Sequence, residues 1–143
     1  LAADLTRRAA GLLESVEQIA AATVNQSAQL RTKLSARLRK LLEGATDIPL
    51  DPGRLEMEVA LLADRTDVSE ELTRLRSHLA QLRELLAVSR PEPVGRKLEF
   101  LIQELGREAN TVGAKVADAG AAQHVLEVKA ELERMREQVQ NVL

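Results

Sequence analysis

Four polar side chains in the second half of the sequence have types and spacing that suit metal-assisted chemistry. Glu104 and Glu108 are four residues apart, so on a helix they are neighbours on one face. Like charges at this spacing repel by roughly 0.2–0.5 kcal/mol unless a cation lies between them. Glu71 and His78 are seven residues apart, which places them on one edge of another helix. If the two helices pack as a hairpin, the two pairs can face each other.

Such a set of ligands favours one class of metal. Oxygen-rich ligands with one imidazole suit Mn²⁺ or Mg²⁺ better than a structural zinc, and helical carboxylates with a histidine are a known way to build a metal site in a bundle. The metal would activate water at a phosphodiester, with His78 as a general base. Four cations on the same faces could hold phosphate oxygens: Arg74, Lys97, Arg107 and Lys115.

Plainer interpretations of these residues remain open. The glutamates can belong to a solvated helix face whose arginine and lysines neutralise them locally. His78 can be an edge residue that is hydrogen-bonded to Glu71. His124 is expected at the surface or at an interface.

The composition predicts an all-α protein and excludes several classes of site. The 143 residues include 7 Gly, 4 Pro, no Cys and a single aromatic residue, Phe100, which is typical of long helices. A core without aromatics is thin, so we expect helix pairing within or between chains to complete it. A P-loop, a zinc-like Cys/His spacing, a nucleophile elbow and a dinucleotide fingerprint are absent from the sequence.

The net charge and the hydropathy of the sequence limit the expected location of the protein and the kinds of partner that it can bind. The net charge of −2 argues against a generally basic surface but permits a local basic patch. No apolar run of 18 residues occurs in the sequence, so no membrane helix is expected. The cytoplasm is therefore the expected location.

The elements that must position these side chains are helices separated by Gly- and Pro-rich breaks. Residues 1–43 are predicted to form one long helix whose apolar seam weakens near residues 20–26. Residues 44–53 combine Gly, Pro and Asp and end it. The apolar periodicity predicts further helices starting near Arg54 and over 68–88, 95–115 and 121–142.

A second candidate surface lies in the predicted first helix. No acid occurs between Gln18 and Leu42, whereas five cations do, and Lys33, Arg37 and Lys40 share a face. Such a ridge could bind phosphates. The alternative is that these cations lie near a helix C-terminus because the helix dipole favours them there. No aromatic residue is interleaved with them for base stacking.

Three long runs in the second half carry a resemblance to a known family. Residues 58–79, 95–111 and 133–142 resemble the YicC-like family of bacterial endoribonucleases, in the same order along the chain. The resemblance covers about 58–142. One departure is Leu105-Gly106, which stands where the family usually has Met-Asn.

The resemblance implies a fold, an activity and a domain organisation. Residues 1–57 would be a helical arm from the middle of such a protein, and residues 58–143 its C-terminal helical domain, with the family's N-terminal domain outside this chain. Family members are expected to be cytoplasmic, manganese-favouring endoribonucleases that cut single-stranded or structured RNA as homohexamers around a channel.

The resemblance also implies roles for matching residues. The acidic and histidine centre, both catalytic and metal-binding, would be Glu71, His78, Glu104 and Glu108. The RNA contacts implied by the resemblance would be Arg74, Arg96, Lys97 and Arg107. Lys115 on the same helix face, and Arg37 and Lys40 in the basic ridge, are further candidates from the charge pattern alone. Two alternatives of other classes stay open: a helical oligomerisation module without chemistry, and an RNA-binding scaffold that does not cleave.

Overall fold

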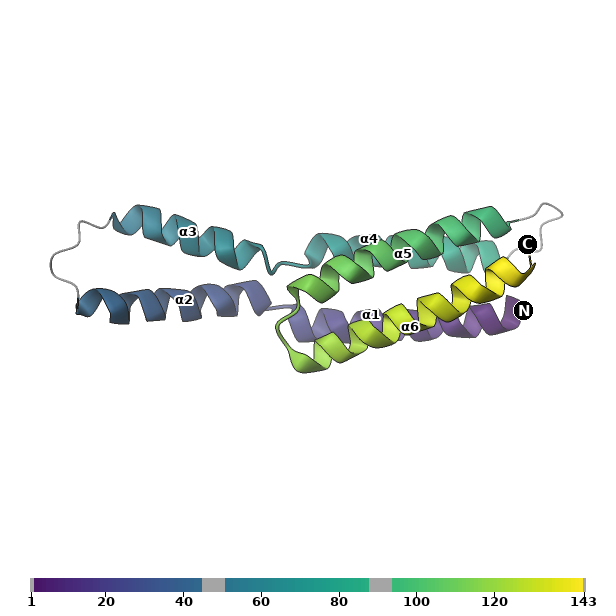
Figure 1. Ribbon diagram of the computed structural model, residues 1–143, viewed down its shortest axis with the longest axis horizontal. Coiled ribbons are helices and arrows are strands. Elements are labelled where there is room, and N and C mark those ends of the chain that lie inside the picture. Colours follow the sequence, from purple (N-terminus) through teal and green to yellow (C-terminus); the bar gives the residue numbers. More distant parts are fainter. Residues whose placement is uncertain (1, 45–50, 88–93, 143) are drawn as a thin grey trace. The chain divides into compact units, whose positions relative to one another are not determined.

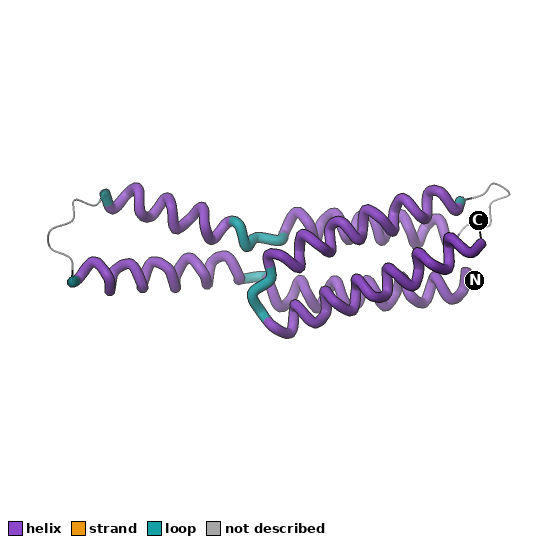
Figure 2. Tube along the Cα trace, in the orientation of Figure 1, coloured by secondary structure: helices purple, strands orange, loops and turns teal. Residues whose placement is uncertain are grey.

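The computed structural model describes residues 2–44, 51–87 and 94–142, and these residues form six helices without a strand (Figures 1 and 2). The all-α prediction is confirmed. Residues 45–50 of the predicted break at 44–53, and residues 89–93 between the predicted helices over 68–88 and 95–115, lie outside the described residues. The helices are α1 (Ala2–Thr23), α2 (Gln26–Glu43), α3 (Pro52–Asp64), α4 (Ser69–Ala87), α5 (Gly95–Lys115) and α6 (Ala119–Val142).

The chain divides into two compact units, and this division differs from the predicted boundary at residue 57. One unit, here called the bundle, contains residues 1–23 and 68–143, and the other, here called the hairpin, contains residues 24–67. The first helix therefore packs with the C-terminal helices. That pairing joins segments far apart in sequence, and the apolar pattern of α1 alone does not indicate its partner.

The bundle is a ring of four helices in which all neighbours are antiparallel. α1 packs on α4, α4 on α5, α5 on α6, and α6 on α1. The register follows from ion pairs between neighbouring helices. Arg8 meets Glu131 across α1 and α6, and Arg76 meets Glu17 across α4 and α1.

Aliphatic side chains alone fill the bundle core. The leucines of α4 that recur every three or four residues are buried from Leu72 to Leu82, and the apolar stripe of α5 is buried from Leu98 to Val112. The largest fully buried side chains include Leu12, Ile19, Leu79, Leu105 and Met135. Phe100 is 58% exposed, so the single aromatic ring contributes little to this core.

The predicted single helix over 1–43 is wrong, because the chain turns at Val24 and Asn25 between α1 and α2. In the last turn of α1 the hydroxyl of Thr23 donates to the carbonyl of Ile19 at 2.8 Å, an alternative partner for a backbone group near the helix end. The weakened apolar seam near residues 20–26 marks this place.

The hairpin consists of α2 packed on α3. Asp51 caps α3 by accepting a hydrogen bond from the backbone N–H of Gly53 at 3.0 Å, and Pro52 occupies the first helical turn. The start of α3 thus lies within two residues of the predicted Arg54. Only two apolar side chains of α3, Val59 and Ala63, are buried.

Among the described residues, no helix is long and apolar enough to cross a membrane.

Candidate active site

Four of the predicted site residues, Glu71, Arg74, Glu108 and Lys115, meet along one edge of the α4–α5 pair. Lys115 Nζ donates to Glu71 Oε1 at 2.8 Å, and Arg74 Nε donates to Glu108 Oε1 at 2.8 Å. Both contacts cross from one helix to the other, and their antiparallel register brings His78 level with Glu104. α4 and α5 thus pack as an antiparallel hairpin, with Glu71 and His78 on one helix and Glu104 and Glu108 on the other.

Burial distinguishes two of these carboxylates from the other acids. Among the described residues, Glu71 and Glu108 are the only buried carboxylates, at 5% and 8% exposure. A buried carboxylate is costly unless a cation or a hydrogen bond compensates it. Arg74 and Lys115 supply that compensation, and Arg74 also approaches Glu71 at 3.8 Å.

The state of Glu71 reflects opposing influences on its pKa. Burial raises the pKa of Glu71, but the hydrogen bond from Lys115, a hydrogen bond from its own backbone and the charges of Lys115 and Arg74 together lower it below its ordinary value. The carboxylate is therefore ionised at neutral pH. Its Oε2 atom is buried and has no hydrogen-bond partner among the described residues.

His78 and Glu104, the remaining residues of the predicted centre, have fewer polar contacts than Glu71 and Glu108. The His78 Nδ1 atom is buried and has no hydrogen-bond partner among the described residues, so the hydrogen bond to Glu71 considered above is not formed. Glu104 is half-buried, and its nearest cation is Arg107 at 3.9 Å. Two polar atoms on this edge, Glu71 Oε2 and His78 Nδ1, thus lack partners where most buried polar groups have them.

Four carboxylate and histidine ligands do not converge here. Within the described ranges, no group of three or more His, Asp or Glu side chains could hold a metal ion. Glu71 and Glu108 instead each direct one oxygen at a cation. The residues of this edge, as arranged, do not fit a manganese ion, and a metal would have to displace Arg74 or Lys115.

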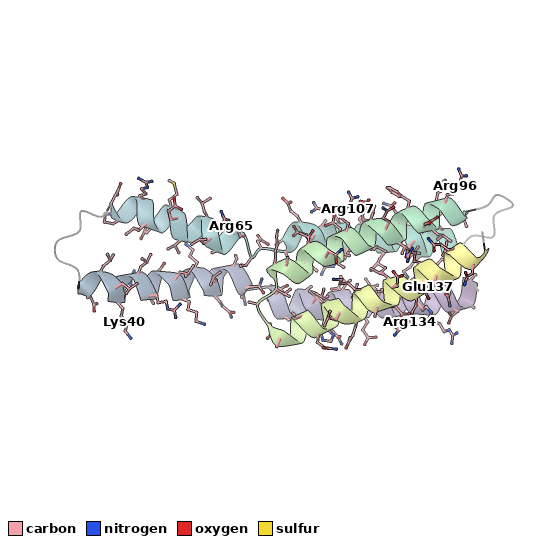
Figure 3. The ribbon with its side chains drawn as sticks, in the orientation of Figure 1. Lys40, Arg65, Arg96, Arg107, Arg134 and Glu137 are labelled. Carbon is pink, nitrogen blue, oxygen red and sulfur yellow. The ribbon has the colours of Figure 1, made fainter. Side chains whose placement is uncertain are left out.

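The predicted RNA contacts fall into two groups. Arg74 and Lys115 are engaged with the buried carboxylates. The others are exposed: Arg96 and Lys97 in the first turn of α5, Arg107 further along α5, and Arg37 and Lys40 on α2. Figure 3 labels Arg96, Arg107 and Lys40.

Sequence reasoning missed a polar network between α1 and α6. Asp4 accepts hydrogen bonds from Gln138 at 2.6 Å and from Arg8 at 3.0 Å, and Arg8 also donates to Glu131 at 2.7 Å. The network borders a groove of about 530 Å³ that Arg7 and Arg134 also line. Its partners are 123 and 134 residues apart, so no local spacing could have revealed it.

Comparison with known proteins identifies the family of this sequence. Residues 19–143 match the family described as "Endoribonuclease YicC-like, C-terminal". The chain is 39% identical over 142 residues to "Probable endoribonuclease YicC" of Clostridioides difficile strain 630, which covers 99% of this chain and 47% of that protein. It is also 39% identical over 131 residues to the protein of the same name from Haemophilus influenzae, which covers 90% of this chain and 45% of the relative.

The chain thus spans about half the length of these curated relatives. It belongs to the YicC-like endoribonuclease family and matches the family's C-terminal domain.

Proposed function

We propose that this chain takes part in the cleavage of RNA phosphodiester bonds, with the α4–α5 edge as the reacting site. The observation that carries this proposal is the pair of buried carboxylates, Glu71 and Glu108, held by two cations. Desolvated carboxylates held by specific cations are common at functional sites, and the pKa of Glu71 is lowered below its ordinary value by Lys115 and Arg74 against the effect of burial. The names of the relatives and the family match support RNA as the substrate class.

The geometry gives each side chain a role in this proposal. Arg74 is 46% exposed at its side chain, so an incoming phosphate can compete with Glu108 for its guanidinium. A carboxylate released in this way becomes a proton acceptor beside the bound phosphate. His78, level with Glu104 along the same edge, is the second candidate for proton transfer.

The proposal has three further parts, which the family resemblance implies. They are dependence on manganese, assembly as a homohexamer, and action on structured or small regulatory RNA. The manganese requirement is proposed without a ligand set from the α4–α5 edge, for the reason given above. EDTA treatment followed by addition of Mn²⁺ or Mg²⁺ tests it. Cleavage that continues unchanged in EDTA would contradict it.

The test of the site is cleavage of an end-labelled RNA that contains a hairpin and a single-stranded tail. Glu71→Gln and Glu108→Gln keep the shape of each side chain and remove its charge, and each is expected to lower the cleavage rate at least about tenfold. Glu133→Gln is the matched control, because Glu133 belongs to an exposed ion pair with Arg136. Wild-type rates in both buried-site variants would rule out this edge.

Product ends separate two routes of cleavage. Attack by water leaves a linear phosphate, whereas attack by the RNA 2′-hydroxyl leaves a cyclic phosphate. Mapping the ends after partial digestion distinguishes them, and cyclic ends would rule out water activated by a metal as the nucleophile.

A second candidate function, RNA binding without cleavage, is favoured by α2. Arg31, Lys33, Arg37, Arg39 and Lys40 are all exposed, and none of them forms an ion pair with a described residue. A scaffold of this kind predicts RNA binding that weakens steeply with salt and is lost when Arg37 and Lys40 are changed to Glu. Binding without any cleavage by the longest natural protein that contains this sequence would favour the scaffold.

A further inference from the structure

The outer face of α5 carries the only aromatic ring of the protein between two arginines. Arg96, Phe100, Gln103 and Arg107 follow one another at steps of four, three and four residues, so they form one stripe along the helix. All four side chains are exposed. The stripe lies opposite the face that buries Leu98, Leu101 and Leu105.

The exposure of Phe100 is unexpected for a protein with so few large side chains. A phenylalanine can bury 150–250 Å² and is usually placed inside. Here the core is filled by Leu, Val, Ile and Met, while Phe100 stays 58% exposed. More than half of the surface of Phe100 therefore stays open to solvent and available to a partner.

Cations outnumber acids around the ring on α5: Arg96, Lys97 and Arg107 lie near it in sequence, against Glu99 and Glu104. Arg96 and Lys97 form no ion pair with any residue that the structure describes, and Arg107 meets only Glu104, at 3.9 Å. Glu99, the residue before Phe100, accepts a hydrogen bond from Gln140 of α6 at 3.1 Å. Figure 3 labels the two arginines of the stripe, Arg96 and Arg107, along α5.

We propose that this stripe is a binding site for unpaired nucleotides of RNA, in which a base stacks on Phe100 and the flanking phosphates are held by Arg96 and Arg107. Aromatic rings interleaved with cations are the general means of binding single strands. The amide of Gln103 adds a donor and an acceptor beside the ring for a base edge. This inference deepens the proposed function and rests on RNA being its substrate.

The dimensions agree with a short single strand. Arg96 and Arg107 are 11 residues apart, which is about 16 Å along a helix. Stacked nucleotides advance about 3.4 Å each along a strand, so the stripe spans about five of them. A duplex cannot use the ring, because its bases are already stacked on one another, whereas loops and tails can.

The face suits nucleotides better than a second protein surface. A helix-binding partner would need several apolar residues in a row on this face, but the stripe offers one ring between two guanidinium groups. Leu126 on α6 is a comparable exposed apolar side chain, at 59%, with Lys129 as its single cation three or four residues away and no flanking pair of arginines. It provides the matched control.

The sequence lacks Trp and Tyr, so one substitution turns the site into its own reporter. Phe100→Trp introduces the only indole, and its fluorescence is measured as a 12-nucleotide oligoadenylate RNA is added in EDTA at low salt. We expect quenching that saturates with the RNA and is reversed by salt. Leu126→Trp, with equal exposure on another helix, is expected to show no saturable quenching.

A second measurement uses the native ring. Phe100→Leu keeps an apolar side chain but removes the stacking surface, and it is expected to weaken binding of a labelled oligoadenylate at least about fivefold by anisotropy. Circular dichroism and thermal unfolding of each variant verify the fold. Binding of a blunt RNA duplex is expected to change less than twofold.

The outcomes separate this inference from the proposed function. Unquenched Phe100→Trp fluorescence, with RNA binding intact by anisotropy, overturns the stacking site and leaves the proposed function in place. Quenching by RNA in a protein that never cleaves overturns the proposed function and leaves the stacking site. If the fluorescence of Phe100→Trp changes with protein concentration and not with added RNA, the stacking site is overturned. This face would then be a contact with a second copy of the chain.

Discussion

At the scale of single residues, the α4–α5 edge depends on charge compensation. Glu71 and Glu108 are buried, so each of them requires its partner cation for stability. Their presence on this edge could be predicted from helical spacing. Their pairing with Arg74 and Lys115 could not, since side chains of several rotamers could reach across the hairpin.

Lys115→Met tests the compensation at Glu71. Removal of the 2.8 Å contact leaves a carboxylate at 5% exposure with Arg74 as its remaining cation. We expect the free energy of unfolding in urea to fall by about 2 kcal/mol at neutral pH. Adding Glu71→Gln to Lys115→Met should restore more than half of this loss, and a double variant that is as unstable as the sum of both single changes would contradict the pairing.

The α1–α6 network predicts a dependence of stability on acid. Hydrogen bonds from Gln138 and Arg8, followed by the charges of Arg8 and Arg7, lower the pKa of Asp4 from 3.8 to about 2. Because the pKa in the folded state lies below that of the unfolded chain, ionised Asp4 stabilises the fold above about pH 4, and this contribution is lost as the pH falls toward 2.

Asp4→Asn is therefore expected to lower the thermal midpoint at pH 7, and its difference from the wild type should shrink as the pH falls through 4 toward 2. Thermal unfolding at several pH values measures it. Glu14→Gln, an exposed acid on the same helix, is the control. A difference that is the same at all these pH values would show that the network does not depend on ionised Asp4.

At the scale of helices, the sequence predicts the elements better than their partners. The predicted helix over 95–115 coincides with α5. Prolines in the preceding sequence indicate where it starts, and its apolar stripe continues without interruption to its last turn. The helix over 1–43 was predicted too long, because the period of its leucines continues through the turn at residues 24–25. The closure of the bundle by α1 depends on contacts between distant segments, which helical periodicity does not encode.

Two glycines within α5, Gly106 and Gly113, differ in the space beside them, so alanine is expected to affect stability differently at the two positions. A Cβ atom at Gly106 would have no neighbour within 4 Å, whereas a Cβ at Gly113 would lie 3.1 Å from Val125 Cγ1. Gly106→Ala is expected to stabilise the protein by roughly 0.5–1 kcal/mol, since alanine restricts the unfolded chain and favours the helix. Urea denaturation measures this gain.

Gly113→Ala is the matched comparison, because the same helical preference is opposed there by the close contact with Val125. It is expected to gain less than Gly106→Ala or to destabilise. A larger gain at residue 113 than at residue 106 would contradict the packing of α5 on α6.

At the scale of the whole molecule, the proposed homohexamer makes a prediction about the hairpin. Met57 and Leu61 are 65% and 52% exposed and lie four residues apart on α3. Exposed apolar residues that share a face commonly mark association surfaces. The Met57→Lys, Leu61→Lys double variant is expected to lower the molar mass measured by light scattering, whereas Leu126→Lys leaves it unchanged. An unchanged mass in the double variant would place the subunit contacts elsewhere.

The most direct test of the proposed function is the cleavage rate of the longest natural protein that contains this sequence, with and without the buried carboxylates. Wild-type protein with Mn²⁺ should cut an end-labelled RNA that has a hairpin and a single-stranded tail. Glu71→Gln and Glu108→Gln should lower that rate at least about tenfold, and Glu133→Gln should leave it unchanged. Equal rates in all four proteins would contradict the assignment of the α4–α5 edge as the site of RNA cleavage.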